Sequence, residues 1–271
     1  MVLTIKGKPV WNAIGVASLL SFLLLATGFA MAVIDYYHPA SPAPKPSPLA
    51  PEKESSDDGK KVLVSLGDSL TRGTGDISGK GYVGRVSDAM KRVYGDRVTA
   101  VNLGVNGQTS ADLVKQTRQR EVRQLLKRAT WITVTVGGND LFRSSGGPEQ
   151  VDRVAIDKGR AAYRRNLSRL LKEIRELNSE APVFIYGLYN PFGDLSGQQE
   201  TSRLVMEWNE TITEVSQKFP RIVVVPTFDL FQLNPSKHLY SDHYHPNQAG
   251  YRKMAERLLQ AMDIKGGDED R

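Results

Sequence analysis

The fold of this chain is decided by Val62-Leu63-Val64-Ser65-Leu66-Gly67-Asp68-Ser69-Leu70. The apolar run at the start predicts a buried strand, and Gly67 permits a sharp turn directly after it. Ser69 then opens a helical segment, where backbone N–H groups favour developing negative charge. The stretch therefore predicts a strand that ends by presenting a hydroxyl group. An ordinary serine cap of a helix would give the same local pattern.

Further apolar runs alternate with helical patterns along the rest of the chain. Strands are predicted over Val62–Leu66, Val98–Leu103, Trp131–Val136, Val183–Leu188 and Ile222–Val225. Helices are predicted over Tyr82–Tyr94, Ala111–Lys127, Asp157–Asn178 and Gln198–Lys218, with a last one starting at Pro246. Alternating strands and helices imply a parallel sheet covered on both faces. In such sheets ligands bind beyond the carboxyl ends of the strands.

Polar residues follow two of the other predicted strands. In the segment 102–110, Gly107 would let a backbone N–H approach a bound oxygen atom. A loop before a helix capped by Ser110 is the alternative interpretation. After the third strand, Gly137-Gly138-Asn139-Asp140 offers the amide of Asn139 as a hydrogen-bond donor. A simple turn of glycine and asparagine is the alternative there.

An acid and an imidazole stand together near the C-terminus, in Asp242-His243-Tyr244-His245-Pro246. The spacing from Asp242 to His245 lets the carboxylate bond one ring nitrogen while the other faces the serine. His243 is the competing base, but its position next to Asp242 favours a different direction. A metal site made by Asp242, His243 and His245 is a further alternative, although no other ligand cluster is evident.

These segments resemble the four sequence blocks of the GDSL (SGNH) esterases and lipases. The blocks are 67–70, Gly107 within 102–110, 137–140, and Asp242 with His245-Pro246, and the resemblance extends from Lys61 to Met262. It implies an α/β, three-layer, flavodoxin-like SGNH hydrolase fold with a five-stranded parallel sheet. The overall layout, with an N-terminal membrane segment and Leu188-Tyr189-Asn190-Pro191-Phe192, resembles the exported lipase/acylhydrolase-type members of the family in Gram-positive bacteria.

The same resemblance implies roles for individual residues. Ser69 would be the nucleophile, His245 the base and Asp242 its partner. The oxyanion hole would consist of the Ser69 N–H, the Gly107 N–H and the Asn139 side chain.

The expected function is a serine esterase or acylhydrolase that forms an acyl-enzyme at Ser69 and needs no cofactor and no metal. The substrate would be either lipid acyl esters or O-acyl groups of envelope glycans. Phe142 and Phe192 would contact the acyl chain, or would be core residues. The alternative function is a catalytically inert binding protein of the same fold at the cell envelope.

The N-terminal region has a different composition. Residues 1–9 contain Lys6 and Lys8, and residues 10–34 carry no charge. A helix over 10–34 would be about 38 Å long, enough to cross a hydrocarbon layer of about 30 Å. We expect a retained membrane anchor or a signal cleaved near Ala32, with residues 1–9 in the cytoplasm. The domain would then lie outside the membrane, or be secreted after cleavage.

A proline-rich disordered linker is predicted over 35–60, the hydrolase domain over 61–265, and a polar tail over 266–271. Cysteine is absent, which excludes disulfides, thiolate metal sites and a cysteine nucleophile. The net charge is +6, but basic residues often precede acids, as in Lys172-Glu173. We interpret them as solvated helix faces and expect no nucleic-acid partner. The oligomeric state is left open.

Overall fold

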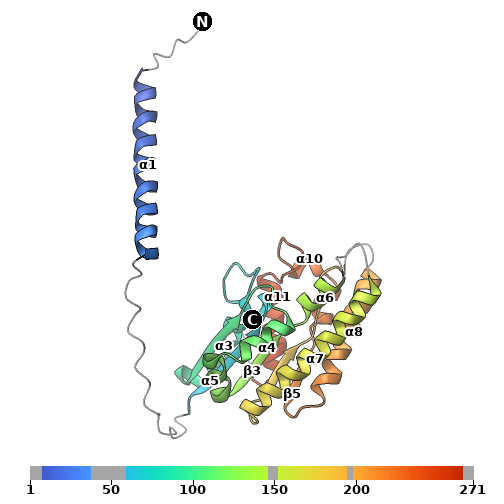
Figure 1. Ribbon diagram of the computed structural model, residues 1–271. Coiled ribbons are helices and arrows are strands. Elements are labelled where there is room, and N and C mark those ends of the chain that lie inside the picture. Colours follow the sequence, from blue (N-terminus) through green and yellow to red (C-terminus); the bar gives the residue numbers. More distant parts are fainter. Residues whose placement is uncertain (1–7, 38–58, 146–151, 194–197, 265–271) are drawn as a thin grey trace, which may run out of the picture. The chain divides into compact units, whose positions relative to one another are not determined.

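The computed structural model describes residues 8–37, 59–145, 152–193 and 198–264 of the chain. The chain divides into two units, Met1–Ser56 and Asp57–Arg271. The described part of the first unit is helix α1 (Lys8–Tyr37) (Figure 1). Within the described residues, no helix has both the length and the apolar character required to cross a membrane. Nearly all of the predicted linker over 35–60, and the whole tail over 266–271, lie outside the described residues.

A parallel sheet of five strands forms the centre of the second unit, as the sequence predicts. Its strands are β1 (Lys61–Gly67), β2 (Val98–Gly104), β3 (Trp131–Thr135), β4 (Val183–Tyr186) and β5 (Ile222–Val225). They are arranged in the order β2-β1-β3-β4-β5, and every neighbouring pair is parallel. The carboxyl end of β1 therefore lies between those of β2 and β3.

Helices cover both faces of the sheet (Figure 1). The longer ones are α3 (Gly81–Tyr94), α4 (Ser110–Thr117), α5 (Arg120–Arg128), α6 (Gly138–Ser145), α7 (Arg153–Leu177), α8 (Gln198–Ser216) and α11 (Gln248–Ala261). The shorter ones are α2 (Ser69–Arg72), η1 (Gly95–Arg97), α9 (Phe228–Gln232) and α10 (Pro235–His238).

Alternate residues of β1 point to opposite faces, because successive side chains of a strand do so. Val64 and Leu66 pack with buried residues of α4, α5, α7 and α8. Leu63 packs on the other face with residues of α3 and α11. The result is a helix–sheet–helix arrangement, which confirms the three-layer α/β prediction. Among the described residues, all members of both core clusters lie between Val62 and Ile264.

The single helix predicted over Ala111–Lys127 is wrong, because α4 and α5 are separate helices. Gln119 has extended backbone angles (φ −65°, ψ 138°) and interrupts the helical path. Just before it, the Arg118 guanidinium donates two hydrogen bonds to Glu173 of α7, at 3.1 and 2.6 Å. The side chain of Thr117 also donates to Glu173. Hydrogen bonds to Glu173 of α7 thus stabilise the chain between α4 and α5. Glu173 is far away in the sequence, so a local sequence pattern cannot predict this interruption.

The prediction that the last helix starts at Pro246 is also wrong. Pro246 forms an antiparallel bridge with Leu239 instead. The Asn247 side chain then accepts hydrogen bonds from the N–H groups of Ala249 and Gly250, so that α11 begins at Gln248. His245 therefore lies in a loop before the helix.

Candidate active site

Ser69 is placed by the turn at the end of β1. Gly67 has a φ of +146°, and a side chain there would lie 2.3 Å from Thr135 Oγ1. Asp68 follows and caps α2, because its Oδ1 accepts a hydrogen bond from Leu70 N at 3.0 Å. Ser69 is thus the first residue of a helix rather than its cap, and its side chain faces the catalytic histidine candidate.

Three of the residues singled out in the sequence form one hydrogen-bonded line. His245 Nε2 lies 2.8 Å from Ser69 Oγ, and His245 Nδ1 lies 2.7 Å from Asp242 Oδ2. The carboxylate can only accept from the ring, so Nδ1 carries the proton and Nε2 can accept one from the serine. Burial acts to raise the pKa of Asp242, but hydrogen bonds from the His245 ring and from the N–H groups of His245 and Tyr244 hold it below its usual value.

His243 does not take part in this line. Its backbone adopts a left-handed conformation (φ +55°), and its side chain is exposed to solvent. Both ring nitrogens of His245 are engaged by Asp242 and Ser69. Across the described ranges, no group of three or more histidines, aspartates or glutamates is arranged to hold a metal ion.

The predicted oxyanion-hole residues lie on both sides of Ser69, because Gly107 follows β2 and Asn139 follows β3. In the part of the chain that the structure describes, neither the Ser69 N–H nor the Gly107 N–H donates to a protein acceptor. Asn139 Nδ2 donates one hydrogen bond to Gln108 O at 2.9 Å. Its second amide hydrogen points to no described acceptor. The Ser69 and Gly107 N–H groups therefore have no described acceptor, and Ser69 and Asn139 both line the same pocket.

Helix α6 holds the loop that carries Gly107, and the sequence analysis missed this role. Arg143 Nη2 donates to Gly107 O at 2.9 Å. Asp140 accepts from Ser110 N at 2.9 Å and from Ser110 Oγ at 2.5 Å. Together with Asn139, two further side chains of one short helix fix this loop. In a helix that starts at Gly138, positions 139 and 143 are one turn apart and lie on the same side. This spacing could have predicted that Arg143 contacts the same loop as Asn139.

Asp68 is a buried carboxyl group beside the nucleophile. Burial raises its pKa to about 6, although hydrogen bonds from the Thr135 hydroxyl and from Leu70 N act in the opposite direction. Thr135 Oγ1 lies 2.8 Å from Asp68 Oδ1 and 2.8 Å from Thr71 Oγ1. From Thr71 the buried hydroxyl chain continues through Tyr82 OH, Thr133 Oγ1 and Ser65 Oγ.

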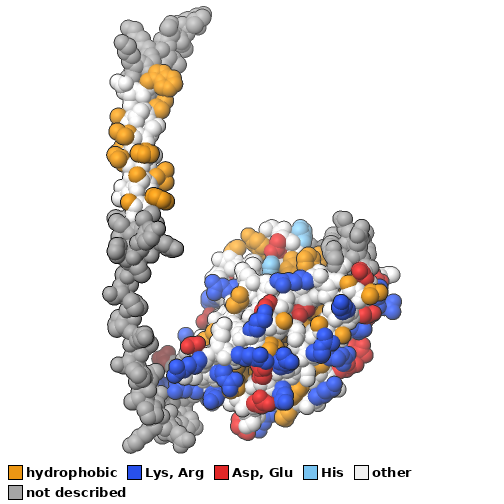
Figure 2. Space-filling model, in the orientation of Figure 1, with side chains coloured by type: hydrophobic (Ala, Val, Ile, Leu, Met, Phe, Trp, Pro, Cys, Tyr) orange, Lys and Arg blue, Asp and Glu red, His pale blue; other side chains and the backbone are white. Residues whose placement is uncertain are grey.

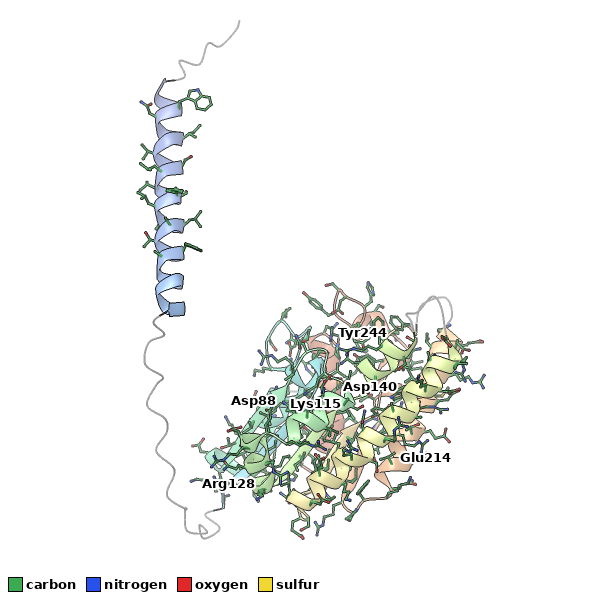
Figure 3. All side chains as sticks on the ribbon, in the orientation of Figure 1. Asp88, Lys115, Arg128, Asp140, Glu214 and Tyr244 are labelled. Atoms are coloured by element: carbon green, nitrogen blue, oxygen red, sulfur yellow. The ribbon has the colours of Figure 1, made fainter. Side chains whose placement is uncertain are left out.

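An apolar pocket of about 850 Å³, including the space open to solvent, begins at Ser69. Its apolar lining includes Leu141, Phe142, Leu188, Phe192, Leu204 and Val205. Both phenylalanines singled out in the sequence thus face the pocket rather than the core. Tyr244 also lines it and packs edge-on against Phe142, with ring centroids 6.1 Å apart. Figure 3 labels Tyr244 and Asp140 at the same end of the domain.

A Ser-His-Asp line at the carboxyl edge of an α/β sheet is the arrangement of serine hydrolases. Residues 65–253 match the GDSL-like lipase/acylhydrolase family. The chain is 33% identical over 210 residues to the uncharacterized protein YpmR of Bacillus subtilis strain 168. The matched residues cover 76% of this chain and 82% of YpmR. The chain belongs to the GDSL-like lipase/acylhydrolase family. It is a carboxylic ester hydrolase.

Other relatives agree with this assignment. The spore germination lipase LipC of Bacillus licheniformis is 27% identical over 204 residues, covering 73% of this chain and 94% of LipC. The lipase Lip_vut3 from a goat rumen metagenome has a TM-score of 0.67 at 25% identity, covering 74% of this chain and 97% of its own. The acetylxylan esterase Axe2 of Geobacillus stearothermophilus shares the fold, with a TM-score of 0.60 at 22% identity and coverages of 78% and 97%.

Proposed function

We propose that this chain hydrolyses acyl esters with apolar acyl chains, such as those of lipids, through an acyl-enzyme at Ser69. The observation that carries the catalytic part is the unbroken line from Ser69 Oγ to His245 and Asp242, with both hydrogen bonds below 3 Å. The observation that carries the substrate class is the apolar pocket at Ser69.

The reaction follows from this geometry. His245 Nε2 takes the hydroxyl proton as Ser69 Oγ attacks the ester carbonyl carbon. The N–H groups of Ser69 and Gly107 and the Asn139 amide stabilise the negative oxygen of the tetrahedral intermediate. When the carbon–oxygen bond of the ester breaks, His245 gives the proton to the leaving alcohol. Water then attacks the acyl-enzyme by the same route, and Asp242 stabilises the positive imidazole in both halves.

The pocket favours lipid acyl esters over O-acetyl groups of glycans. An acetyl group has a single methyl to bury, whereas side chains such as Leu141, Leu204 and Val205 offer a long apolar wall. Burial of each methylene contributes about 0.8 kcal/mol, so a longer chain gains more binding energy here. The acetylxylan esterase Axe2 resembles this chain in fold alone, so its substrate gives no support for acetyl esters as the substrate of this chain.

Alanine variants test the catalytic part on a soluble p-nitrophenyl ester. Ser69→Ala and His245→Ala should each lower kcat by a factor of at least about 10⁴, and the double variant should be little worse, since the triad acts as a unit. His243→Ala is the matched control and should retain most of the activity. Equal losses in the two histidine variants would contradict the assignment of the base. An inactive wild type would favour the inert binding protein.

An acyl-chain series from acetate to laurate tests the substrate class. The value of kcat/KM should rise with chain length in the wild type. Val205→Phe fills part of the pocket and should lower the rate for long chains while leaving acetate hydrolysis near the wild-type value. Met206→Phe is the control, because Met206 is the neighbouring residue of α8 and is exposed. A series that peaks at acetate would contradict the lipid proposal.

The proposed location is the outer side of a membrane, with the chain held there by residues 10–34. The support is the uncharged sequence of that segment, with Lys6 and Lys8 before it. The described apolar side chains of α1, Leu24 and Phe29 among them, are exposed within this chain (Figure 2). Protease added to intact spheroplasts should digest the domain. Digestion only after lysis would place the domain inside, and release of the protein into the medium would indicate cleavage.

A further inference from the structure

The most exposed large apolar side chains of the catalytic unit come from three separate loops or helix ends. Among the described residues, Leu233, Ile77 and Val154 are 88%, 84% and 79% exposed. Leu233 lies between α9 and α10, Ile77 between α2 and α3, and Val154 at the start of α7. Isolated exposed apolar residues need no explanation, but a group of them at one place marks an interaction site.

The connectivity places these three residues beyond the carboxyl ends of β1, β3 and β5, on the edge of the sheet that carries the active site. The segments around them follow the carboxyl ends of strands or begin the helices that return along the sheet. Val105 and Phe142, each about half exposed, follow β2 and β3 at the same edge. Figure 2 shows hydrophobic side chains beside histidines at the end of the domain where Figure 1 labels α10 and α6.

The loop of Ile77 lies directly against the catalytic residues. A side chain added at Gly75, two residues earlier, would lie 3.1 Å from both His245 Cβ and Tyr240 Cβ. Tyr240 is itself partly exposed. Phe142 both lines the pocket and reaches solvent. Phe142 therefore lies at the mouth of the pocket, and the loop of Ile77 adjoins the catalytic histidine candidate.

Three exposed cations at this end form no ion pair with a described carboxylate. Arg72, Arg143 and Lys237 are exposed in α2, α6 and α10. The exposed carboxylates of Asp152 and Asp242 already accept hydrogen bonds, from the N-terminus of α7 and from His245. An apolar surface with available cations fits a layer of apolar chains beneath anionic head groups.

We propose that the active-site end of this domain docks on an anionic lipid surface through an apolar rim made of Ile77, Val105, Phe142, Val154 and Leu233. The proposal rests on the proposed function, because the lipid that enters the pocket would come from the surface on which the rim rests. Docking removes the need to carry an acyl chain through water, which costs free energy for every methylene.

Vesicle binding tests the rim independently of catalysis. The protein is the chain shortened to residues 59–271, which contains every described core residue, and it carries Ser69→Ala so that no lipid is hydrolysed. The rim variant is Ile77→Ser with Leu233→Ser, neither of which lines the pocket. The control is Val93→Ser with Met206→Ser, and both residues are about half exposed. Val93 lies near the C-terminal end of α3, and Met206 lies about two turns after the start of α8.

The shortened chain should cosediment with phosphatidylglycerol vesicles more strongly than with phosphatidylcholine vesicles, and less at high salt. The rim variant should bind at least about tenfold more weakly, because two aliphatic side chains no longer enter the lipid. The control should bind like the unsubstituted chain. With Ser69 restored, the rim variant should hydrolyse a soluble ester normally and a vesicle-borne ester about tenfold more slowly.

Equal vesicle binding by the rim variant and the unsubstituted chain would overturn the proposal, and so would an equal loss in the control. Absence of any vesicle binding would overturn it too, as would a dimer in solution that the rim substitutions dissociate. A failure of the proposed function is seen separately, as a wild type that hydrolyses no soluble ester.

Discussion

At the residue scale, Arg143 lies outside the proposed triad but bonds the backbone of Gly107, a proposed oxyanion donor. Its hydrogen bond to Gly107 O orients the peptide group next to the Gly107 N–H, in a residue with a φ of +72°. Arg143→Ala should lower kcat about tenfold with KM nearly unchanged, because a loosened donor is lost only from the transition state. Steady-state kinetics and thermal midpoints measure the effect.

The Arg143 prediction has a matched control and a second readout. Arg118→Ala removes another exposed arginine, one that pairs with Glu173 on α7, and kcat should not change. Affinity for an alkyl boronic acid, whose adduct with Ser69 carries an anionic oxygen, should fall in parallel with kcat. Guanidinium ion added to Arg143→Ala should restore part of the rate. A rise in KM alone would mean that Arg143 binds substrate instead.

The raised pKa of Asp68 predicts that the free energy of unfolding depends on pH. Its pKa of about 6 in the folded protein lies above the ordinary value of 3.8. The stability that its protonated form contributes is therefore fully present below about pH 4 and is lost as the pH rises through 6. Asp68→Asn keeps an oxygen for Leu70 N and Thr135 Oγ1, both of which bond Oδ1, and cannot ionise.

Relative to the wild type, Asp68→Asn should therefore gain on the order of 2 kcal/mol in free energy of unfolding between pH 4 and pH 8. Urea unfolding at a series of pH values measures the difference. A difference between the two proteins that does not change with pH would contradict the raised pKa of Asp68.

Single residues differ in how far the sequence reveals them. Local patterns predict that three residues follow strands, namely Ser69, Gly107 and Asn139. Sequence spacing predicts that Asp242 lies close to His245. Arg143 and its partner Gly107 are 36 positions apart. That contact depends on the packing of α6 beside the loop after β2, which no local pattern reports.

At the element scale, the strands were the most predictable parts. The central strands are buried on both faces and read as unbroken apolar runs, as in Val183–Tyr186. Helix ends were less predictable, because capping decides them. Thr109, rather than Ser110, caps α4 through a reciprocal pair of hydrogen bonds with Asp112. Asp152 caps α7, which begins at Arg153, four residues before the predicted boundary. Helix α6 was not predicted, and a turn at Gly137-Gly138 was only the alternative interpretation there.

At the scale of the whole molecule, the sequence predicts two parts with separate tasks, and the structure supports the independence of the second. Among the described residues, the hydrogen bonds of the catalytic site come from Ser65 to Tyr251, and the core residues come from Val62 to Ile264. The part before Ser56 forms a unit of its own. A loss of that part should therefore change where the enzyme acts and leave its chemistry unchanged.

A chain shortened to residues 59–271 should therefore be soluble, fold cooperatively and hydrolyse a soluble ester with the kcat of the full chain. The five strands of the sheet and every residue of the proposed triad are retained, and the described core residues all lie at or after Val62. The full chain should instead sediment with membranes, because residues 10–34 carry no charge to keep them in water. Ultracentrifugation of lysates, with activity measured in both fractions, checks both statements. A shortened chain that aggregates or loses activity would show that the first unit contributes to folding, and a full chain in the soluble fraction would contradict the anchor.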